Sequence, residues 1–299
     1  MKILITGHAG FVGSHFHRRL AEHDLTLVDI ADHKGVAWEA AHFFRTNDTK
    51  YDLVIHLAAT VGGRRVIDLE PSRLFNNLVL DSEMIQWALR TKPGKVVYYS
   101  SSAAYPAGLQ TRYNYDPHPA HAMNVHKLKE EDINLDDVRT PDPSIYGWSK
   151  LTGEQMLRYV KNELNVWIFR PFSGYSEAQS LDYPFPSFIA RALRRDDPFD
   201  IWGDGNQVRD WIHIDDIVEF TLAALESDPD VWNICTGRPT AFNDFAEILT
   251  NMAGYSPRLN HILTAPVGVQ YRVGDPTKMN AIRPAQISLE QGIRRALMI

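Results

Sequence analysis

Short apolar runs alternate along the chain with segments in which apolar residues recur every three or four positions. Val12, Phe16 and Leu20 share one face of a predicted helix, and residues 156–164 follow the same period. Apolar runs without polar alternation are typical of parallel strands that are covered on both faces. The pattern therefore predicts an α/β fold around a parallel sheet. The strand-like runs are 3–5, 25–28, 53–55, 96–99 and 166–169.

The rhythm changes after Arg170, where Pro171, Pro184, Pro186 and Pro198 interrupt the pattern. We expect a smaller α/β region there, interleaved with the first. The predicted domains are 1–170 plus about 209–235, and 171–208 plus 236–299. Residues 106–145 form a long polar segment without periodicity, a length typical of functional or disordered loops.

Composition narrows the class of protein. The chain has 299 residues, with 31 Lys and Arg against 37 Asp and Glu, so its net charge is −6. No basic stripe stands out, which argues against a nucleic-acid binder, and no apolar run has the length of a membrane span. The single Cys235 excludes an intrachain disulfide framework and suits a reducing compartment. We expect a cytoplasmic protein that binds neither nucleic acid nor membrane.

A glycine-rich turn follows the first predicted strand and opens the first predicted helix. Gly7, Gly10 and Gly13 have the spacing that permits a tight turn and lets the backbone approach a pyrophosphate at a helix N-terminus. Asp29 ends the second predicted strand, where a carboxylate accepts hydrogen bonds from a ribose and repels a 2′-phosphate. Together they predict a Rossmann-type, doubly wound sheet that binds NAD rather than NADP.

Tyr146 and Lys150 are four residues apart in a predicted helix and so share one face. An ammonium beside a phenol stabilises the phenolate, and the pair is a candidate acid/base unit once a cationic nicotinamide adds to the effect. Ser101 and Ser102 follow the fourth predicted strand at the sheet edge where ligands bind, so a serine hydroxyl can hold a substrate oxygen beside Tyr146.

With these motifs the chain resembles the extended short-chain dehydrogenase/reductase family, specifically its nucleotide-sugar epimerases and dehydratases. The resemblance covers nearly the whole chain. The matching stretches are 6–13, 56–59, 100–105, 146–150, 170–172, 203–210 and 272–275.

The resemblance implies roles for the matching positions. It makes Tyr146 the base, Lys150 the group that holds the nicotinamide ribose, and Ser101 the hydrogen-bond partner of the sugar oxygen. The cofactor residues that it implies are Gly7, Gly10, Phe11, Val12, Gly13, Asp29, Leu57, Ala58, Ala59, Asn77, Tyr146, Lys150 and Pro171. The implied substrate residues are Ser101, Ser102, Tyr146, Ser173, Arg209, Arg272 and Asp275, with Arg209 and Arg272 clamping the diphosphate. The family also implies a homodimer through helices near 75–90 and 146–163.

Departures from the family pattern select among its reactions. Dehydratases, decarboxylating members and 3,5-epimerases need an acid or a Cys at or near the position of Ala103, and residues 175–185 contain neither Lys nor His. Removal of a proton next to a ketone needs a titratable group. We therefore predict C4 epimerisation of a nucleoside-diphosphate hexose by oxidation and re-reduction. The alternatives are a 4,6-dehydratase, a 3,5-epimerase, a 4-ketoreductase and a non-catalytic NAD-binding scaffold. Ser173, where the family usually has Asn, is a further departure.

Several other residues could be metal ligands or ligand contacts, but a structural role explains them more simply. His118, His121 and His126 lack metal-ligand spacing, so we predict no metal site. Asp215 and Asp216 are expected to open a helix rather than bind a metal. We place Trp202 in the core, and we expect no helix between Asp29 and Tyr51.

Overall fold

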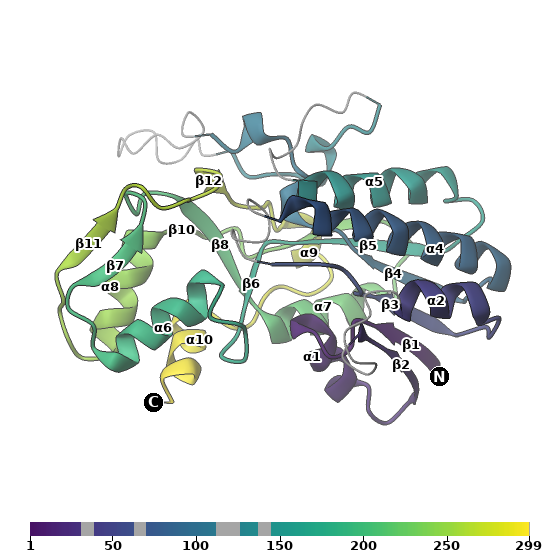
Figure 1. Ribbon diagram of the computed structural model, residues 1–299, viewed down its shortest axis with the longest axis horizontal. Coiled ribbons are helices and arrows are strands. Elements are labelled where there is room, and N and C mark those ends of the chain that lie inside the picture. Colours follow the sequence, from purple (N-terminus) through teal and green to yellow (C-terminus); the bar gives the residue numbers. More distant parts are fainter. Residues whose placement is uncertain (31–38, 63–69, 112–125, 137–144, 299) are drawn as a thin grey trace.

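Six parallel strands form the central sheet of the computed structural model, which describes residues 1–30, 39–62, 70–111, 126–136 and 145–298. The sheet order is β2–β1–β3–β4–β5–β9, and each of the five predicted runs lies in it (Figure 1). The α/β prediction is confirmed. The strands are β1 (Lys2–Thr6), β2 (Asp24–Val28), β3 (Leu53–His56), β4 (Lys95–Tyr99), β5 (Val166–Pro171) and β9 (Val231–Ile234).

The strand order reverses at β1. Strand β2 pairs with one edge of β1, and β3 pairs with the other, so the chain proceeds across the sheet in opposite directions from this point. A crevice opens at the carboxyl ends of the strands at such a switch point. The loop that starts at Gly7 and the loop that starts at Leu57 therefore face one another there.

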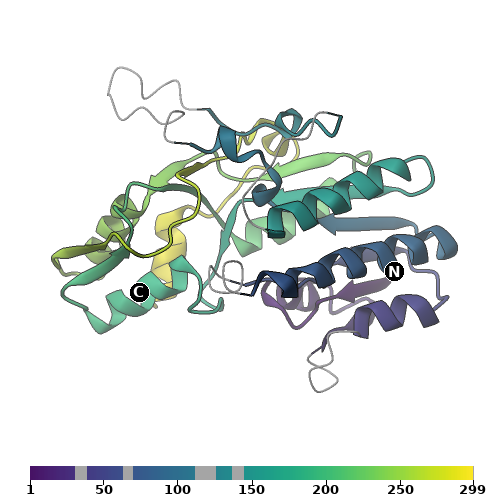
Figure 2. The ribbon, with the colours of Figure 1, turned by 45° about the horizontal axis from the view of Figure 1, so that its top comes forward.

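Helices cover both faces of the sheet. Helices α2 (Glu39–Thr46), α4 (Phe75–Thr91) and α5 (Ile145–Tyr159) run side by side on one face, while α1 (Phe11–Arg19) and α7 (Ile214–Ala224) pack on the other (Figures 1 and 2). The alternation of strand side chains explains the two layers. Ile3 and Ile5 belong to the core under α1 and α7, whereas Leu4 belongs to the core under α2 and α4.

A second body is built from shorter strands. β6 (Ser173–Tyr175), β8 (Val208–His213), β10 (Pro239–Ala241) and β12 (Tyr271–Arg272) form one sheet, and β7 (Phe199–Trp202) pairs with β11 (Leu259–Ile262). Phe185, Phe188 and Phe245 stack at its centre. The predicted domain boundaries stay a prediction. The remaining helices are α6 (Pro184–Arg194), α8 (Phe242–Met252), α9 (Thr277–Asn280), α10 (Leu289–Leu297), and the 3-10 helices η2 (Pro71–Leu74), η3 (Ser102–Ala104), η4 (Ala107–Leu109) and η6 (Glu130–Asp132).

Three local expectations are wrong. Helix α2 lies within the span where we expected no helix, because Ala40, Ala41 and Phe44 pack against α4. Helix α5 ends at Tyr159, whose side chain is exposed because the chain turns there instead of continuing the helix. Trp202 is 46% exposed at the end of β7, so it is not a core residue. None of the helices in the described part of the chain is both long and apolar enough to cross a membrane.

Candidate active site

The glycine turn after β1 leaves no room for side chains. Gly7 has a φ of +75°, and a Cβ built on it would lie 2.7 Å from the backbone nitrogen of Ala58. A Cβ on Gly13 would lie 2.0 Å from the carbonyl oxygen of Gly7. Gly10 is the N-cap of α1, which Phe11 and Val12 begin. The backbone of the turn therefore lies close against the first turn of α1. This leaves the N-terminus of the helix open to a dinucleotide pyrophosphate.

Asp29 lies beside this turn, one residue beyond the end of β2. Its Oδ2 accepts a hydrogen bond of 3.0 Å from the backbone N–H of Ala9. The carboxylate is thus held at the crevice, where it can face a ribose rather than only solvent. The donor set, with backbone amides at the turn and a carboxylate at the next strand end, fits NAD.

The loop after β3 supplies the opposite wall. Leu57, Ala58 and Ala59 continue from the strand, and Ala58 N–H donates to the Thr6 hydroxyl at 3.3 Å. Asn77 of α4 fixes the end of this loop, because its Oδ1 accepts from Thr60 N–H at 2.6 Å and its Nδ2 donates to Thr60 O at 3.0 Å.

Asn77 also connects this wall to the predicted acid/base helix. Its Nδ2 is 3.5 Å from Ser149 Oγ, and that hydroxyl donates to the carbonyl oxygen of Tyr146 at 2.9 Å. Asn77 and Ser149 are fully buried. The amide therefore supports the predicted cofactor loop and the start of α5 together.

Tyr146 and Lys150 lie one turn apart at the start of α5, and Ser101 meets the Tyr146 phenol from the end of β4. Ser101 Oγ also accepts from the backbone N–H of Ala103 at 3.0 Å, which caps η3 and fixes the position of the hydroxyl. The structure thus brings together the three predicted catalytic residues. Ala103 is buried beside them and presents only a methyl group.

Burial dominates the electrostatics of this pair. Loss of solvation raises the pKa of Tyr146 to about 12, although the hydrogen bond with Ser101 and the guanidinium of Arg272 act to lower it. Burial also lowers the pKa of Lys150, against the carboxylates of Asp81 and Glu154. The side chains of the protein alone therefore keep the phenol protonated near neutral pH.

Two of the predicted substrate residues are arginines on strands of the second body. Arg272 of β12 acts electrostatically on Tyr146, and its Nε donates to Gln110 Oε1. Arg209 of β8 donates to the carbonyl oxygens of Val208 and Val267 at 2.8 and 3.2 Å, respectively.

The other predicted substrate and cofactor residues lie at or near the ends of secondary-structure elements. Asp275 accepts from the backbone N–H of Thr277 at the start of α9, at 2.9 Å. Pro171 ends β5, Ser173 begins β6, and Ser102 is buried in η3. The structure thus places Ser102 beside Ser101, while Arg209 and Asp275 lie on other elements.

Sequence reasoning missed four residues near this site. Glu154 and Arg170 form a buried bidentate ion pair, and the signal was available because Glu154 is four residues after Lys150 on the same helix face. Gln110, which holds Arg272, comes from a loop and gave no signal. Tyr183, at the start of α6, is a second phenol whose pKa is raised to about 12, mainly by burial and then by Tyr146.

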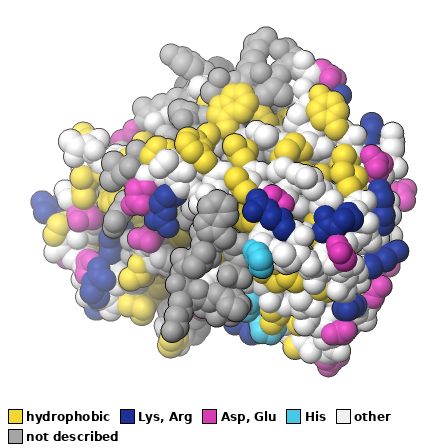
Figure 3. Space-filling model, turned by 45° about the vertical axis from the view of Figure 1, so that its right-hand side comes forward, with side chains coloured by type: hydrophobic (Ala, Val, Ile, Leu, Met, Phe, Trp, Pro, Cys, Tyr) yellow, Lys and Arg dark blue, Asp and Glu magenta, His cyan; other side chains and the backbone are white. Residues whose placement is uncertain are grey.

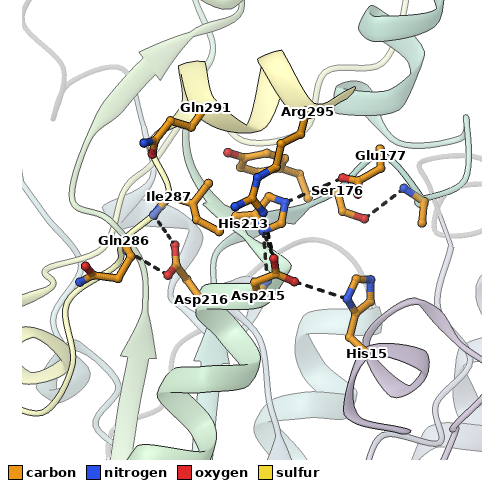
Figure 4. A network of polar contacts seen from close by, with 12 residues as sticks. His15, Ser176, Glu177, His213, Asp215, Asp216, Gln286, Ile287, Gln291 and Arg295 are labelled. Carbon is orange, nitrogen blue, oxygen red and sulfur yellow. Dashed lines mark hydrogen bonds and ion pairs between the residues drawn. The ribbon is translucent and has the colours of Figure 1, made fainter. Parts of the chain in front are cut away.

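Outside this site, the acidic pair that we expected to open a helix does so. Asp215 and Asp216 lie in the first turn of α7. Asp215 pairs with Arg295 of α10 at 3.0 Å and lies 3.7 Å from His15 of α1, so it joins the two bodies (Figure 4). Asp216 accepts from the backbone N–H groups of residues 286 and 287. Both carboxylates are therefore structural.

Of the three histidines considered as metal ligands, the structure describes one. His118 and His121 lie outside the described residues, and His126 pairs with Asp132 at 2.8 Å. Among the residues that the structure describes, no three His, Cys, Asp or Glu side chains are grouped to hold a metal.

Comparison with known proteins gives a consistent result. The model of a family described as "NAD dependent epimerase/dehydratase family" matches residues 3–235. A putative UDP-glucose 4-epimerase of Methanocaldococcus jannaschii is 27% identical over 320 residues, covering 99% of this chain and 97% of the relative. GDP-mannose 3,5-epimerase 1 of Oryza sativa subsp. indica is 27% identical over 302 residues, covering 93% and 75%.

Solved structures share the fold. UDP-glucose 4-epimerase of Thermotoga maritima, crystallised with UDP-glucose, has a TM-score of 0.79 at 24% identity and covers 100% of this chain and 98% of its own. UDP-glucuronic acid 4-epimerase of Bacillus cereus, crystallised with UDP-glucuronic acid and NAD, has a TM-score of 0.76 at 24% identity, with the same coverage. At this identity the likeness establishes the Rossmann-type fold and no more.

Proposed function

Because this chain belongs to the NAD-dependent epimerase/dehydratase family, whose cofactor is NAD, we propose that it inverts C4 of a nucleotide-bound hexose. The reaction is a transient oxidation to a 4-keto sugar followed by re-reduction from the opposite face. The single observation that carries this choice is the set of Tyr146, Ser101 and buried Lys150 beside a methyl group at Ala103. This set can move one proton at one hydroxyl, and it offers no carboxylate or thiol at the position of Ala103.

Tyr146 removes the proton of the C4 hydroxyl while that carbon is oxidised, and returns it when the carbon is reduced. Ser101 holds the sugar oxygen within reach of the phenol. When NAD is bound, it accepts a hydride and gives it back, and its positively charged ring favours the ionised phenol. Lys150 binds the ribose next to that ring and adds its own positive charge.

The remaining predicted residues bind and orient. The turn from Gly7 to Gly13, with Phe11 and Val12, holds the pyrophosphate, and Asp29 holds the adenosine ribose. The loop 57–59, Asn77 and Pro171 line the nicotinamide half. Arg209 and Arg272 neutralise the diphosphate of the substrate, Asp275 contacts its ribose, and Ser102 and Ser173 line the sugar site.

The test is a panel of UDP- and GDP-hexoses, incubated with the NAD-bound protein and analysed by NMR. We expect a C4-inverted sugar from at least one, with no added reduced cofactor, and a loss of at least about a hundredfold in Tyr146→Phe. A panel without any C4-inverted product contradicts the proposal. Equal turnover in Tyr146→Phe removes this phenol from the mechanism.

The second candidate is a dehydratase or 3,5-epimerase, which one observation favours. Tyr183 interacts with Tyr146 electrostatically and is a second phenol near the site, although residues 175–185 contain no Lys or His. A reaction that needs a second acid would use it. Tyr183→Phe therefore separates the two: the C4 epimerase keeps its turnover in this variant, whereas the alternatives lose it. With Tyr183 in place, the alternatives release a 4-keto-6-deoxy sugar or a sugar altered at C3 and C5.

We also propose a cytoplasmic homodimer that pairs through α4 and α5. Phe75 and Val79 on α4, and Trp148 and Tyr159 on α5, are exposed, and hydrophobic side chains recur across this side of the molecule (Figure 3). Exposed apolar side chains on neighbouring helices suit an interface. Light scattering after size exclusion should give twice the chain mass of 34.0 kDa, and a monomer at all concentrations contradicts the proposal.

A further inference from the structure

A chain of buried polar side chains runs from the loop after β3 to helix α4. Ala58 N–H donates to Thr6 Oγ1 at 3.3 Å, and Thr6 Oγ1 lies 2.8 Å from His56 Nδ1. His56 Nε2 lies 3.2 Å from Asp81 Oδ1. The His56 ring thus bridges the Thr6 hydroxyl and the Asp81 carboxyl group, with one ring nitrogen toward each.

The other oxygen of Asp81 is also occupied. The Tyr98 hydroxyl donates to Oδ2 at 2.7 Å, so both oxygens of Asp81 have a hydrogen-bond partner. Asp81 is fully buried, and its two side-chain hydrogen-bond partners are His56 and Tyr98. A buried carboxylate without a counterion is strongly unfavourable.

The matching positive charge lies across the Tyr98 ring. Lys150 Nζ is 5.1 Å from the centre of this ring, whose hydroxyl holds Asp81. Gly153 allows the close packing, because a Cβ there would lie 2.0 Å from Tyr98 Oη and 2.8 Å from Asp81 Oδ2. Helix α5 thus presses its backbone against the Asp81–Tyr98 pair, with Lys150 one turn earlier.

The second carboxylate that acts on Lys150 is Glu154, and it already has a cationic partner. Glu154 binds Arg170 through two hydrogen bonds, Nε to Oε1 at 2.9 Å and NH2 to Oε2 at 2.6 Å. Its charge is compensated by a guanidinium. Of the two carboxylates that act on Lys150, Asp81 is therefore the one whose charge is left for the ammonium.

We infer that Asp81 is the buried counterion of Lys150, and that it is a positioning residue for the Tyr146–Lys150 couple, acting across Tyr98. The inference rests on the proposed roles of Tyr146 and Lys150. It also links the predicted cofactor loop to the acid/base pair, because Ala58 begins the chain that ends at Asp81.

The electrostatics of the site agree with this geometry. Burial lowers the pKa of Lys150, and Asp81 is the first of the groups that raise it. The same carboxylate raises the pKa of Tyr146. Loss of the Asp81 charge should therefore lower both pKa values. The groups around Lys150 are Asp81 from α4, Tyr98 from β4, His56 from β3, Tyr146 and Glu154 from α5, and Arg170 from β5 behind Glu154.

The experiment titrates the Tyr146 phenol in the NAD-bound protein by its phenolate absorbance, with Tyr146→Phe as the blank. In Asp81→Asn we expect the midpoint to fall by about one pH unit, and the acid limit of turnover to fall with it, because the phenol must be ionised to remove a proton. Tyr98→Phe removes the hydroxyl but keeps the charge, so its midpoint should stay at the wild-type value. An unchanged midpoint in Asp81→Asn overturns the inference.

Asp216→Asn is the matched control for the loss of a buried carboxylate. Asp216 is 4% exposed and accepts two backbone hydrogen bonds far along the chain, at the start of α7 (Figure 4). Its variant should lose stability without moving the midpoint. A shift as large as that of Asp81→Asn would mean that the shift follows from lost stability, and would overturn the inference.

A double-mutant cycle in urea covers the case in which Asp81→Asn folds poorly. If Asp81 and Lys150 compensate one another, Asp81→Asn with Lys150→Met should lose less stability than the sum of the single losses. Additive losses overturn the inference. The titration and the cycle need no sugar, so a failed search for C4 epimerisation removes the proposed function without deciding the counterion.

Discussion

Helix α5 contributes one member to each of two buried pairs of opposite charge, and the pairs differ in how closely the charges meet. Glu154 and Arg170 are in direct bidentate contact, at 2.9 and 2.6 Å. Asp81 and Lys150 are kept apart by Tyr98, with the ammonium 5.1 Å from the centre of its ring. The first pair satisfies its charges internally and so contributes to the fold. The second leaves the ammonium able to bind a further group, which is what a cofactor site needs.

The largest expected effect comes from breaking the Glu154–Arg170 pair, called the closed pair here because its two charges are in direct contact. Arg170→Leu leaves Glu154 as a buried carboxylate without its cation, so we expect the free energy of unfolding to fall by about 3–5 kcal/mol in urea. Arg170→Leu with Glu154→Leu should recover much of this loss, because the pair is then replaced by apolar groups. A loss below about 1 kcal/mol in the single variant would show that the pair is not buried in solution.

Breaking the Asp81–Lys150 pair, called the open pair because Tyr98 keeps its charges apart, should affect activity more than stability. In Lys150→Met we expect turnover at pH 7 to fall about a hundredfold, or ~2.7 kcal/mol, because the phenol loses the cation that favours its ionised form. The loss in unfolding free energy should be smaller than in Arg170→Leu, since Asp81 keeps its contacts with His56 and Tyr98, whereas Glu154 loses two direct hydrogen bonds from a guanidinium. Turnover within twofold of wild type would place Lys150 outside the reaction.

The contrast also explains what the sequence could and could not predict. The strands were predictable because an unbroken apolar run such as 3–5 reflects burial on both faces of a sheet. Tyr146, Lys150 and Ser101 were predictable because helix spacing and strand ends encode their positions locally. Whether these residues perform the proposed roles stays a prediction.

Asp81 could not be predicted in the same way. A single carboxylate in a helix is typical of a solvated face, and what makes it a counterion is contact with Tyr98, which lies 17 positions away on another element. Such long-range pairing leaves no periodic signal. Trp202 failed for a related reason, because an aromatic residue at a strand end is buried or exposed according to its distant neighbours.

A smaller effect should follow from filling the contact between α5 and the open pair. A Cβ at Gly153 would lie 2.0 Å from Tyr98 Oη, so Gly153→Ala forces the helix away from β4. We expect a loss of about 1–3 kcal/mol in unfolding free energy. Gly108→Ala is the control, because a Cβ there meets nothing within 4 Å, and its change should stay within about 0.5 kcal/mol. Equal effects would mean that the Gly153 contact relaxes freely.

The smallest effect tests whether burial or geometry makes the closed pair strong. Arg238 and Glu290 also form a bidentate pair, through NH1 and NH2 at 3.0 and 2.7 Å, but their side chains are 49% and 39% exposed. Solvent screens such a pair, so Glu290→Gln should cost less than about 1 kcal/mol at pH 7. A loss as large as that of Arg170→Leu would assign the strength to geometry.

The pH dependence of this variant sharpens the test. The hydrogen bond from Arg238 is the main cause that lowers the pKa of Glu290 from 4.5 to about 2. The carboxylate of the folded protein therefore binds its proton less readily than that of the unfolded chain. The stability from this pair is complete above pH 4.5 and is lost as the pH falls towards 2. Unfolding curves of wild type and Glu290→Gln should converge over that range, and a gap that persists at pH 2 would have to come from a contact other than the ion pair.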